Sequence, residues 1–143
     1  MAIKNQITIY LQSLSENVAI ARVTAAAFAA QIDFTLNEIE EIKVAVSEAI
    51  SNVVIHGYEE GKGQIEFIMN LYQEKVEYII KDSGKGIEDI ALARQPSYSS
   101  DPERMGLGFV FMESFMDELE ISSEVNKGTQ VRMAKKKIRN IGH

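Results

Sequence analysis

The sequence has no cysteine and no tryptophan, and its only histidines among 143 residues are His56 and His143. Without cysteine the chain has neither a disulfide framework nor a thiolate zinc site, and two histidines are too few for a His-rich metal centre. Such a composition is typical of proteins in the reducing cytoplasm. We therefore expect a cytoplasmic protein whose core is held together by packing alone.

Long apolar runs and strong positive charge are also missing. The first ten residues lack the apolar segment of a signal peptide, and the stretch around residues 25–30 is far shorter than the roughly 20 residues that span a bilayer. The formal net charge is −6, and the one basic cluster is Lys135, Lys136 and Lys137. Because binding to a phosphate backbone needs clustered cations, we expect no membrane and no nucleic-acid partner. The lysine cluster itself is interpreted as the solvated end of a strand.

The order of the expected elements indicates the fold class. Alternating apolar residues predict strands at 6–11, 64–72, 75–81, 119–124 and 129–137, and helical spacing predicts helices at 16–31, about 35–57 and 107–115. Four of the strands come as two hairpins, and the helices stand in separate blocks. This order predicts an α+β two-layer sandwich in one domain, residues 1–143, with a mixed, largely antiparallel sheet and helices on one face.

Two helix starts carry a capping-box pattern, in which a hydroxyl residue precedes a glutamate by three positions. The pairs are Ser13 with Glu16 and Thr35 with Glu38. Between the last two helical blocks, residues 88–94 are expected to form a short helix. Residues 95–104 contain both prolines of the chain and no periodicity, so we predict a mobile lid there.

Glu48 and Asn52 are candidates for chemistry because residues four apart lie one above the other on a helix face. An amide oxygen such as that of Asn52 suits Mg²⁺ when nucleotide phosphates supply further ligands. Glu48, one turn earlier, has the side chain of a general base. Taken alone, the two residues are better interpreted as solvent-facing polar positions of the helix. His56 follows them near the helix C-terminus, where a histidine is more often a partner of the helix dipole than a catalyst.

Two glycine-containing turns follow. Asp82, Gly84 and Gly86 come directly after an expected strand, and a carboxylate there can accept a hydrogen bond from the exocyclic amine of adenine. Gly106, Leu107 and Gly108 precede a helix, whose N-terminal N–H groups attract phosphate. In isolation the first turn is an ordinary turn signal. The chain has no Walker A motif, no complete dinucleotide fingerprint and no protein-kinase motif set.

Taken together, in this order and spacing, Glu48, Asn52, Asp82, Gly84, Gly86, Gly106 and Gly108 resemble the GHKL superfamily of ATPases and kinases. Within it the chain is similar to the small bacterial serine kinases of the sporulation anti-sigma-F factor family. Supporting segments include residues 21–28, 42–52, 55–58 and 123–129. The resemblance covers nearly the whole chain and is more specific than any single motif.

The resemblance implies a homodimeric, ATP- and Mg²⁺-dependent serine kinase that sequesters a sigma factor and phosphorylates an anti-anti-sigma protein. It implies Glu48 as the base, Asn52 as the magnesium ligand, Asp82 and Thr129 as adenine-side groups, and Arg104 as a lid contact to the γ-phosphate. His56 and Leu107 join the expected nucleotide-binding residues, and Arg22 is expected on the partner-binding surface.

Two alternatives stay open. A stress-response anti-sigma serine kinase of the same family would keep every ATP residue and change only the partner. A catalytically weak binding module would keep the fold and bind its partner without phosphotransfer, which the presence of Glu48 argues against.

Overall fold

The computed structural model describes residues 2–58, 63–84, 86 and 105–137. In chain order its elements are β1 (Asn5–Gln12), α1 (Glu16–Ala29), α2 (Leu36–Asn52), the π-helix η1 (Val53–Gly57), β2 (Gln64–Leu71), β3 (Lys75–Asp82), α4 (Met105–Phe115), β4 (Glu118–Glu124) and β5 (Gly128–Lys136). The expected helix at 88–94 and lid at 95–104, including Arg104, lie outside the described residues.

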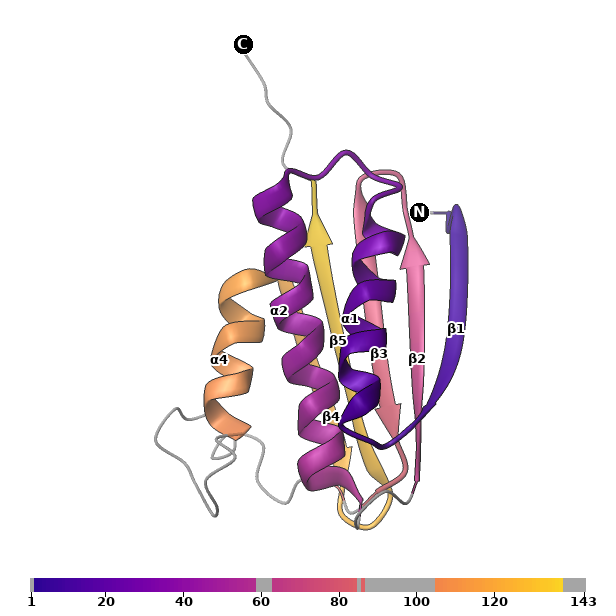
Figure 1. Cartoon of the computed structure of the whole chain (residues 1–143), viewed down its shortest axis with the longest axis vertical. Coiled ribbons are helices and arrows are strands. Elements are labelled where there is room, and N and C mark those ends of the chain that lie inside the picture. The colour runs from indigo at the N-terminus through magenta and orange to yellow at the C-terminus, as the bar shows by residue number, and fades with distance from the viewer. Residues whose placement is uncertain (1, 59–62, 85, 87–104, 138–143) are drawn as a thin grey trace.

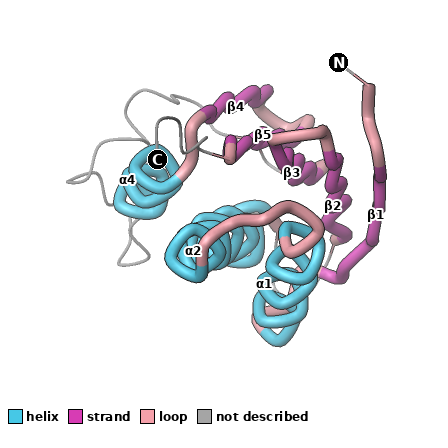
Figure 2. The backbone as a smooth tube through the Cα atoms, turned by 90° about the horizontal axis from the view of Figure 1, so that it is seen from above, coloured by secondary structure: helices cyan, strands magenta, loops and turns pink. Residues whose placement is uncertain are grey.

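The five strands form one sheet in the order β1-β2-β3-β5-β4. Each pair of neighbouring strands is antiparallel, and both expected hairpins, β2-β3 and β4-β5, are present. Figures 1 and 2 show α1, α2 and α4 on the same side of this sheet. The described part of the chain therefore confirms the two-layer α+β fold, with a sheet that is antiparallel throughout.

The core lies between the sheet and the helices because each strand turns every second residue toward them. One row crosses all five strands through paired residues: Ile9, Phe67, Ile80, Val131 and Ile121. From the helices, Phe28, Ile42, Val46 and Ile50 are buried against this side of the sheet. The apolar stripe of α2, which includes Ile42, Val46 and Ile50, therefore forms the centre of the core.

The two predicted capping boxes have different outcomes. Thr35 accepts a hydrogen bond from the Glu38 N–H at 3.1 Å, and the Thr35 N–H donates to the Glu38 carboxylate at 2.8 Å, as expected. The box at Ser13 is wrong, because Ser15 holds the N-cap position of α1. Ser13 instead remains at the end of β1, where its N–H donates to the Gly63 carbonyl and its side chain is buried.

The interpretation of the lysine cluster also needs a correction. Lys136 is exposed, but Lys135 is only 7% exposed on the helix side of β5. Its Nζ donates to Glu41 of α2 at 3.1 Å and to the Phe115 carbonyl at the end of α4 at 2.6 Å. A buried ammonium is tolerated when paired and hydrogen-bonded in this way. Lys135 thus links the sheet to two helices.

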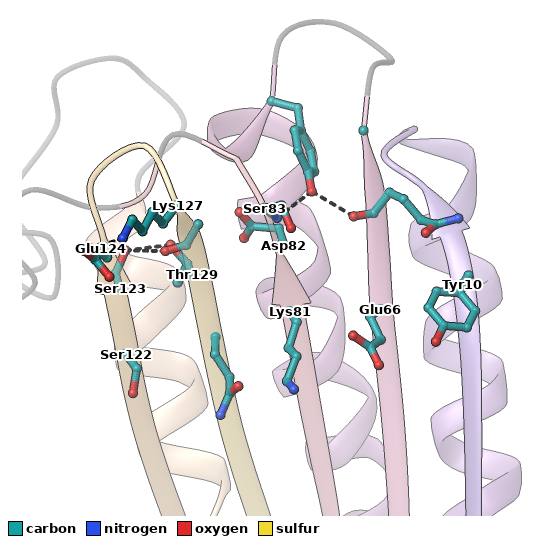
Figure 3. Close-up of a pocket in the computed structure, with 15 residues that line it drawn as sticks. Tyr10, Glu66, Lys81, Asp82, Ser83, Ser122, Ser123, Glu124, Lys127 and Thr129 are labelled. Atoms are coloured by element: carbon teal, nitrogen blue, oxygen red, sulfur yellow. Dashed lines mark hydrogen bonds and ion pairs between the residues drawn. The ribbon is translucent and has the colours of Figure 1, made fainter.

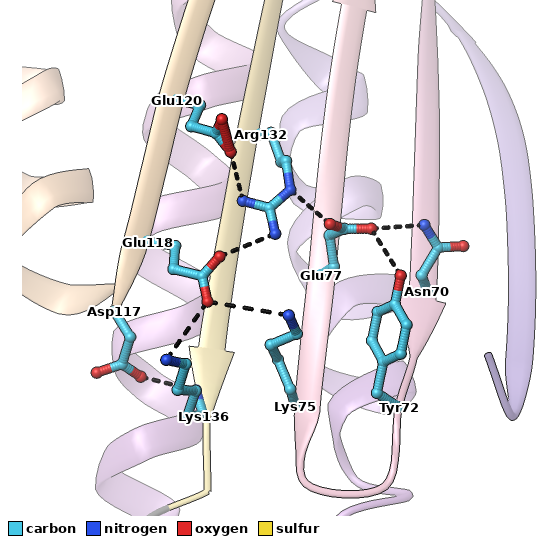
Figure 4. A network of polar contacts seen from close by, with 9 residues as sticks. All are labelled: Asn70, Tyr72, Lys75, Glu77, Asp117, Glu118, Glu120, Arg132 and Lys136. Atoms are coloured by element: carbon cyan, nitrogen blue, oxygen red, sulfur yellow. Dashed lines mark hydrogen bonds and ion pairs between the residues drawn. The ribbon is translucent and has the colours of Figure 1, made fainter. Parts of the chain in front are cut away.

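The other face of the sheet carries a network of charges (Figure 4). At its centre, Arg132 of β5 donates to Glu77 at 2.5 Å, Glu118 at 2.9 Å and Glu120 at 2.8 Å. Glu77 also accepts from Asn70 at 2.8 Å. Because β3 supplies one of these carboxylates and β4 the other two, the guanidinium of β5 joins all three strands.

Among the described residues, no helix is long and apolar enough to cross a membrane.

Candidate functional site

Four segments that are distant in sequence meet at one end of the molecule. The C-terminal end of α2 with η1, the end of β3, the first turn of α4 and the β4-β5 turn lie together at the lower end of Figure 1. The antiparallel pairing of β5 with β3 places Thr129 beside Asp82, and its pairing with β4 places Thr129 beside Ser123. This end of the fold therefore gathers most of the residues that the sequence motifs singled out.

The predicted pair on α2 faces the glycine of α4. A Cβ built on Gly108 would lie 3.0 Å from Glu48 Oε2 and 3.5 Å from both Asn52 Oδ1 and Asn52 Nδ2. Both side chains are half-buried. Asn52 Nδ2 is buried without a hydrogen-bond partner among the residues that the structure describes. A buried amide in that condition costs free energy unless a ligand or water satisfies it.

The end of α2 is irregular at the same place. After Asn52 the helix continues as the five-residue π-helix η1, which ends at Gly57 as the expected helix end did. A π-turn inside a helical path is uncommon and frequently marks a functional site. A small cavity lies at this place, and its lining residues include Asn52, His56, Asp82 and Thr129.

Asp82 ends β3 and turns its carboxylate toward this cavity. The Gly84 N–H donates to Asp82 Oδ1 at 2.9 Å. Burial raises the pKa of the Asp82 carboxyl, and hydrogen bonds from the backbone of Gly84 and Thr129 oppose that rise. The carboxylate is therefore held in place by backbone donors, and Asp82 is one of the residues that line the small cavity.

Gly86, shortly after this turn, lies close to the backbone of the β4-β5 turn. Its φ of +77° lies in the left-handed region, and a Cβ there would overlap the Glu124 carbonyl of the β4-β5 turn. A residue with a side chain would be strained and would clash with backbone. The second glycine of the motif therefore lets the loop after β3 lie against the β4-β5 turn.

Thr129 lies in the first part of β5 and lines the cavity. Its hydroxyl is 2.8 Å from that of Ser123, which the motif search missed. Other cavity residues that it missed are Ala49, Val53, Gly57, Phe109 and Val131. Most are apolar core residues, and only the helical and strand periodicity that runs through Asn52 and Thr129 signals them.

The remaining predicted residues are not all brought to this cavity. Gly106 and Leu107 lie in the first turn of α4, and Leu107 is not among the described residues that line the cavity. Arg22 lies on α1, half-exposed, apart from the cavity-lining residues. Arg104 falls outside the described residues.

The donors present fit an adenine nucleotide with Mg²⁺. Asn52, whose Nδ2 has no described partner, lies close to Gly108 on the α2-α4 side, and Asn52 and Asp82 line the same small cavity. No group of three or more His, Asp or Glu side chains that could hold a metal occurs within the described ranges. Mg²⁺ is often held by one or two protein oxygens together with phosphates, an arrangement that Asn52 suits.

A family model described as a histidine kinase-like ATPase domain matches residues 11–135. The fold, the site and the family match together place the chain in the class of histidine kinase-like ATPase domains. An anti-sigma F factor of Anoxybacillus flavithermus is 47% identical over 135 residues, which cover 92% of this chain and 92% of that relative. An anti-sigma F factor of Clostridium botulinum is 48% identical over 136 residues, covering 93% and 95%. The chain belongs to the anti-sigma F factor family of these ATPase domains.

Solved structures agree on the fold. The RsbU and RsbW domains of a Mycobacterium tuberculosis protein align with a TM-score of 0.66 at 21% identity, over 93% of this chain and 32% of that one. A histidine kinase domain from a blue-light-activated kinase of Erythrobacter litoralis aligns with a TM-score of 0.54 at 16% identity, over 83% of this chain and 60% of that one. At these identities the likeness concerns the fold alone.

Proposed function

We propose that this protein is an anti-sigma factor and ATP-dependent serine protein kinase. In this role it sequesters a sigma factor of the sigma-F type and phosphorylates an anti-anti-sigma protein on serine. The observation that carries the proposal is the meeting of Glu48 and Asn52 over Gly108, at the end of the fold where Asp82 lines a cavity. The family membership supports ATP as the ligand and a sigma factor as the partner.

The residues divide the work by position. Asp82 accepts a hydrogen bond from the adenine amine, with Thr129 beside it on the neighbouring strand. The oxygen of the Asn52 amide holds Mg²⁺, which neutralises phosphate charge when bound. Gly108, which has no side chain, lets the backbone of α4 approach Glu48 and Asn52, where the phosphates are proposed to bind. Arg104 contacts the γ-phosphate, as the family resemblance implies.

Glu48 handles the proton of the reaction. Its carboxylate lies in the space beside Gly108, one helical turn before Asn52. From there it accepts the proton of the substrate serine hydroxyl as the oxygen attacks the γ-phosphorus and the bond to ADP breaks. The step transfers one phosphoryl group and needs no further reactant.

The partner surface is proposed on α1. Arg22 is half-exposed there, and its neighbours Ile20 and Val23 are 53% and 62% exposed. Exposed apolar side chains around an arginine are typical of protein interfaces. The functional unit is a homodimer, and a sigma-factor partner places it in the cytoplasm.

The test separates binding from chemistry on one helix. Glu48→Ala should keep Mg-ATP affinity and lose phosphotransfer by ~10²-fold or more, the usual scale for a general base. Asn52→Ala should instead weaken Mg-ATP binding. Glu40→Ala is the matched control, because Glu40 lies on α2 with a side chain 66% exposed and pairs only with Lys43 among the described residues.

Affinity is measured by calorimetry, and transfer by a single-turnover assay with labelled ATP and candidate anti-anti-sigma proteins. Normal transfer by Glu48→Ala would contradict the base assignment. ATP and sigma-factor binding by the wild type without any transfer would instead identify a binding module. Sigma-factor pull-downs distinguish the sporulation role from a stress-response role.

A further inference from the structure

Tyr58 joins three segments of the site through one hydroxyl group. It follows η1 directly, so it is the first residue after the helical path that carries Glu48 and Asn52. Its hydroxyl donates to the Gln64 carbonyl at the start of β2, at 2.8 Å, and accepts from the Ser83 N–H just after β3, at 2.6 Å. Figure 3 shows Ser83 and Asp82 at the end of this dashed contact.

The backbones around Tyr58 are packed too closely for side chains. A Cβ on Gly63 would overlap the Tyr58 ring, and a Cβ on Gly84 would overlap the Gly57 carbonyl. A Cβ on Gly57 would lie 3.6 Å from Asp82 Oδ1. The segment from Gly57 to Tyr58 therefore interlocks with the turn from Asp82 to Gly84.

This turn sets the direction of the Asp82 carboxylate. Ser83 is the residue between Asp82 and Gly84, and the Gly84 N–H holds Asp82 Oδ1 at 2.9 Å. A contact that fixes the peptide N–H of Ser83 therefore also fixes the carboxylate on one side of it and its donor on the other. The Tyr58 hydroxyl makes that contact.

We propose that Tyr58 is a positioning residue that sets nucleobase selectivity by holding the Asp82 turn in register with the end of η1. The proposal rests on the proposed function, in which Asp82 reads the exocyclic amine of adenine. Without the hydroxyl, the Ser83 N–H loses its acceptor and the carboxylate loses a fixed direction. Selectivity for adenine over a base that lacks the amine then falls, while contacts to the phosphates persist.

The first experiment compares ADP with IDP, whose base carries an oxo group in place of the amine, by calorimetry on the full chain. Wild type should prefer ADP. Tyr58→Phe should reduce that preference roughly tenfold, the scale of one hydrogen bond to a charged group, with little change for IDP. Tyr10→Phe is the control. Tyr10 and Tyr58 line the same pocket, but Tyr10 is 60% exposed.

Each outcome decides a different question. Equal losses for ADP and IDP, or an unchanged preference, would overturn the role of Tyr58. A wild-type protein that binds neither nucleotide would overturn the proposed ATP function and this inference with it.

The second experiment needs no nucleotide. Amide hydrogen exchange at Ser83, followed by NMR, should be at least several-fold faster in Tyr58→Phe than in wild type, because the amide has lost its acceptor. Tyr10→Phe should match wild type. Unchanged exchange at Ser83 in a folded Tyr58→Phe protein would overturn the proposal even if nucleotide affinities had changed.

Discussion

A methyl group added at Gly108 should affect stability and nucleotide binding in opposite ways. Gly108 is the fourth residue of α4, and glycine within a helix is destabilising relative to alanine by up to roughly 0.5–1 kcal/mol. Gly108→Ala therefore favours the helix. The new Cβ, however, would lie 3.0 Å from Glu48 Oε2, closer than the optimal contact of about 3.5 Å.

The magnitude follows from what must move. The Glu48 carboxylate is the end of a flexible side chain, so a shift of about 0.5 Å relieves the contact at a cost of ~0.5–1 kcal/mol. The helix gain and this cost nearly cancel, and the free energy of unfolding should change by less than about 1 kcal/mol. That limit corresponds to a few degrees in Tm for a domain of this size.

Function has no such compensation. The methyl group would stand between α4 and the Glu48 and Asn52 side chains, where the phosphates are proposed to bind, and it displaces Glu48. We expect Mg-ATP affinity to fall about tenfold or more, and phosphotransfer to fall by ~10²-fold, the scale of a 1 Å misplacement of a reacting group. Scanning calorimetry gives the stability, isothermal titration the affinity, and single-turnover assays the rate.

The double variant Glu48→Ala, Gly108→Ala identifies the route of the effect. If the methyl group acts by displacing Glu48, it should cost less affinity in the Glu48→Ala background than in wild type. The reasoning is refuted if Gly108→Ala binds Mg-ATP and transfers phosphate as wild type does. A loss of several kcal/mol in stability would equally refute the estimate of a local displacement.

Three further predictions test other parts of the fold. Since burial raises the pKa of Asp82, the nucleotide-free fold loses stability as pH rises from the ordinary carboxyl range through the raised value; Asp82→Asn should therefore raise Tm at pH 7 while abolishing ADP-over-IDP preference. Arg132→Ala should lower the free energy of unfolding in urea by about 2–3 kcal/mol at pH 7. The loss should shrink as the pH falls from the ordinary carboxyl range through the lowered pKa of Glu118, because the hydrogen bond from Arg132 is what lowers that pKa. Arg22→Ala should weaken sigma-factor binding by ~2 kcal/mol or more in titrations without changing Mg-ATP affinity; normal affinity for sigma factor and anti-anti-sigma protein would remove Arg22 from the interface.

The sequence predicted the elements whose period is strong. The stripe of α2 from Ile42 to Val53 and both hairpins are confirmed, because helical spacing and strict alternation reflect which face must be buried. The capping box at Thr35 succeeded for a local reason, since both partners lie within one turn. At Ser13 the same pattern failed: the Ser13 N–H donates to the carbonyl of Gly63, just before the start of β2, and α1 begins later, with Ser15 as its N-cap.

Long-range partners were the main cause of the other misses. Alternation from Val131 and Met133 already turns Lys135 inward, but a buried lysine is plausible only if a carboxylate waits there. That carboxylate belongs to Glu41, 94 positions away, and the second acceptor is the end of α4. The sequence near Lys135 predicts neither of these two partners. The π-helix after Asn52 also has no distinct local sequence signal. Its last residue, Gly57, packs against Gly84 in the turn after β3, which is a long-range contact.

The local rules of stability are kept through most of this fold and broken at one end of it. There a glycine is the fourth residue of α4, Nδ2 of Asn52 is buried without a described partner, and burial disfavours the charge of Asp82. Each feature costs stability in the nucleotide-free state, and a bound nucleotide with Mg²⁺ would relieve the last two. Substitutions at Gly108 and Asp82 should therefore preserve or raise stability while lowering nucleotide affinity. Arg132→Ala should instead lower stability while preserving nucleotide affinity. Because a purely structural end of the fold would respond like Arg132, this opposition of signs is what distinguishes a binding site from an imperfectly packed corner.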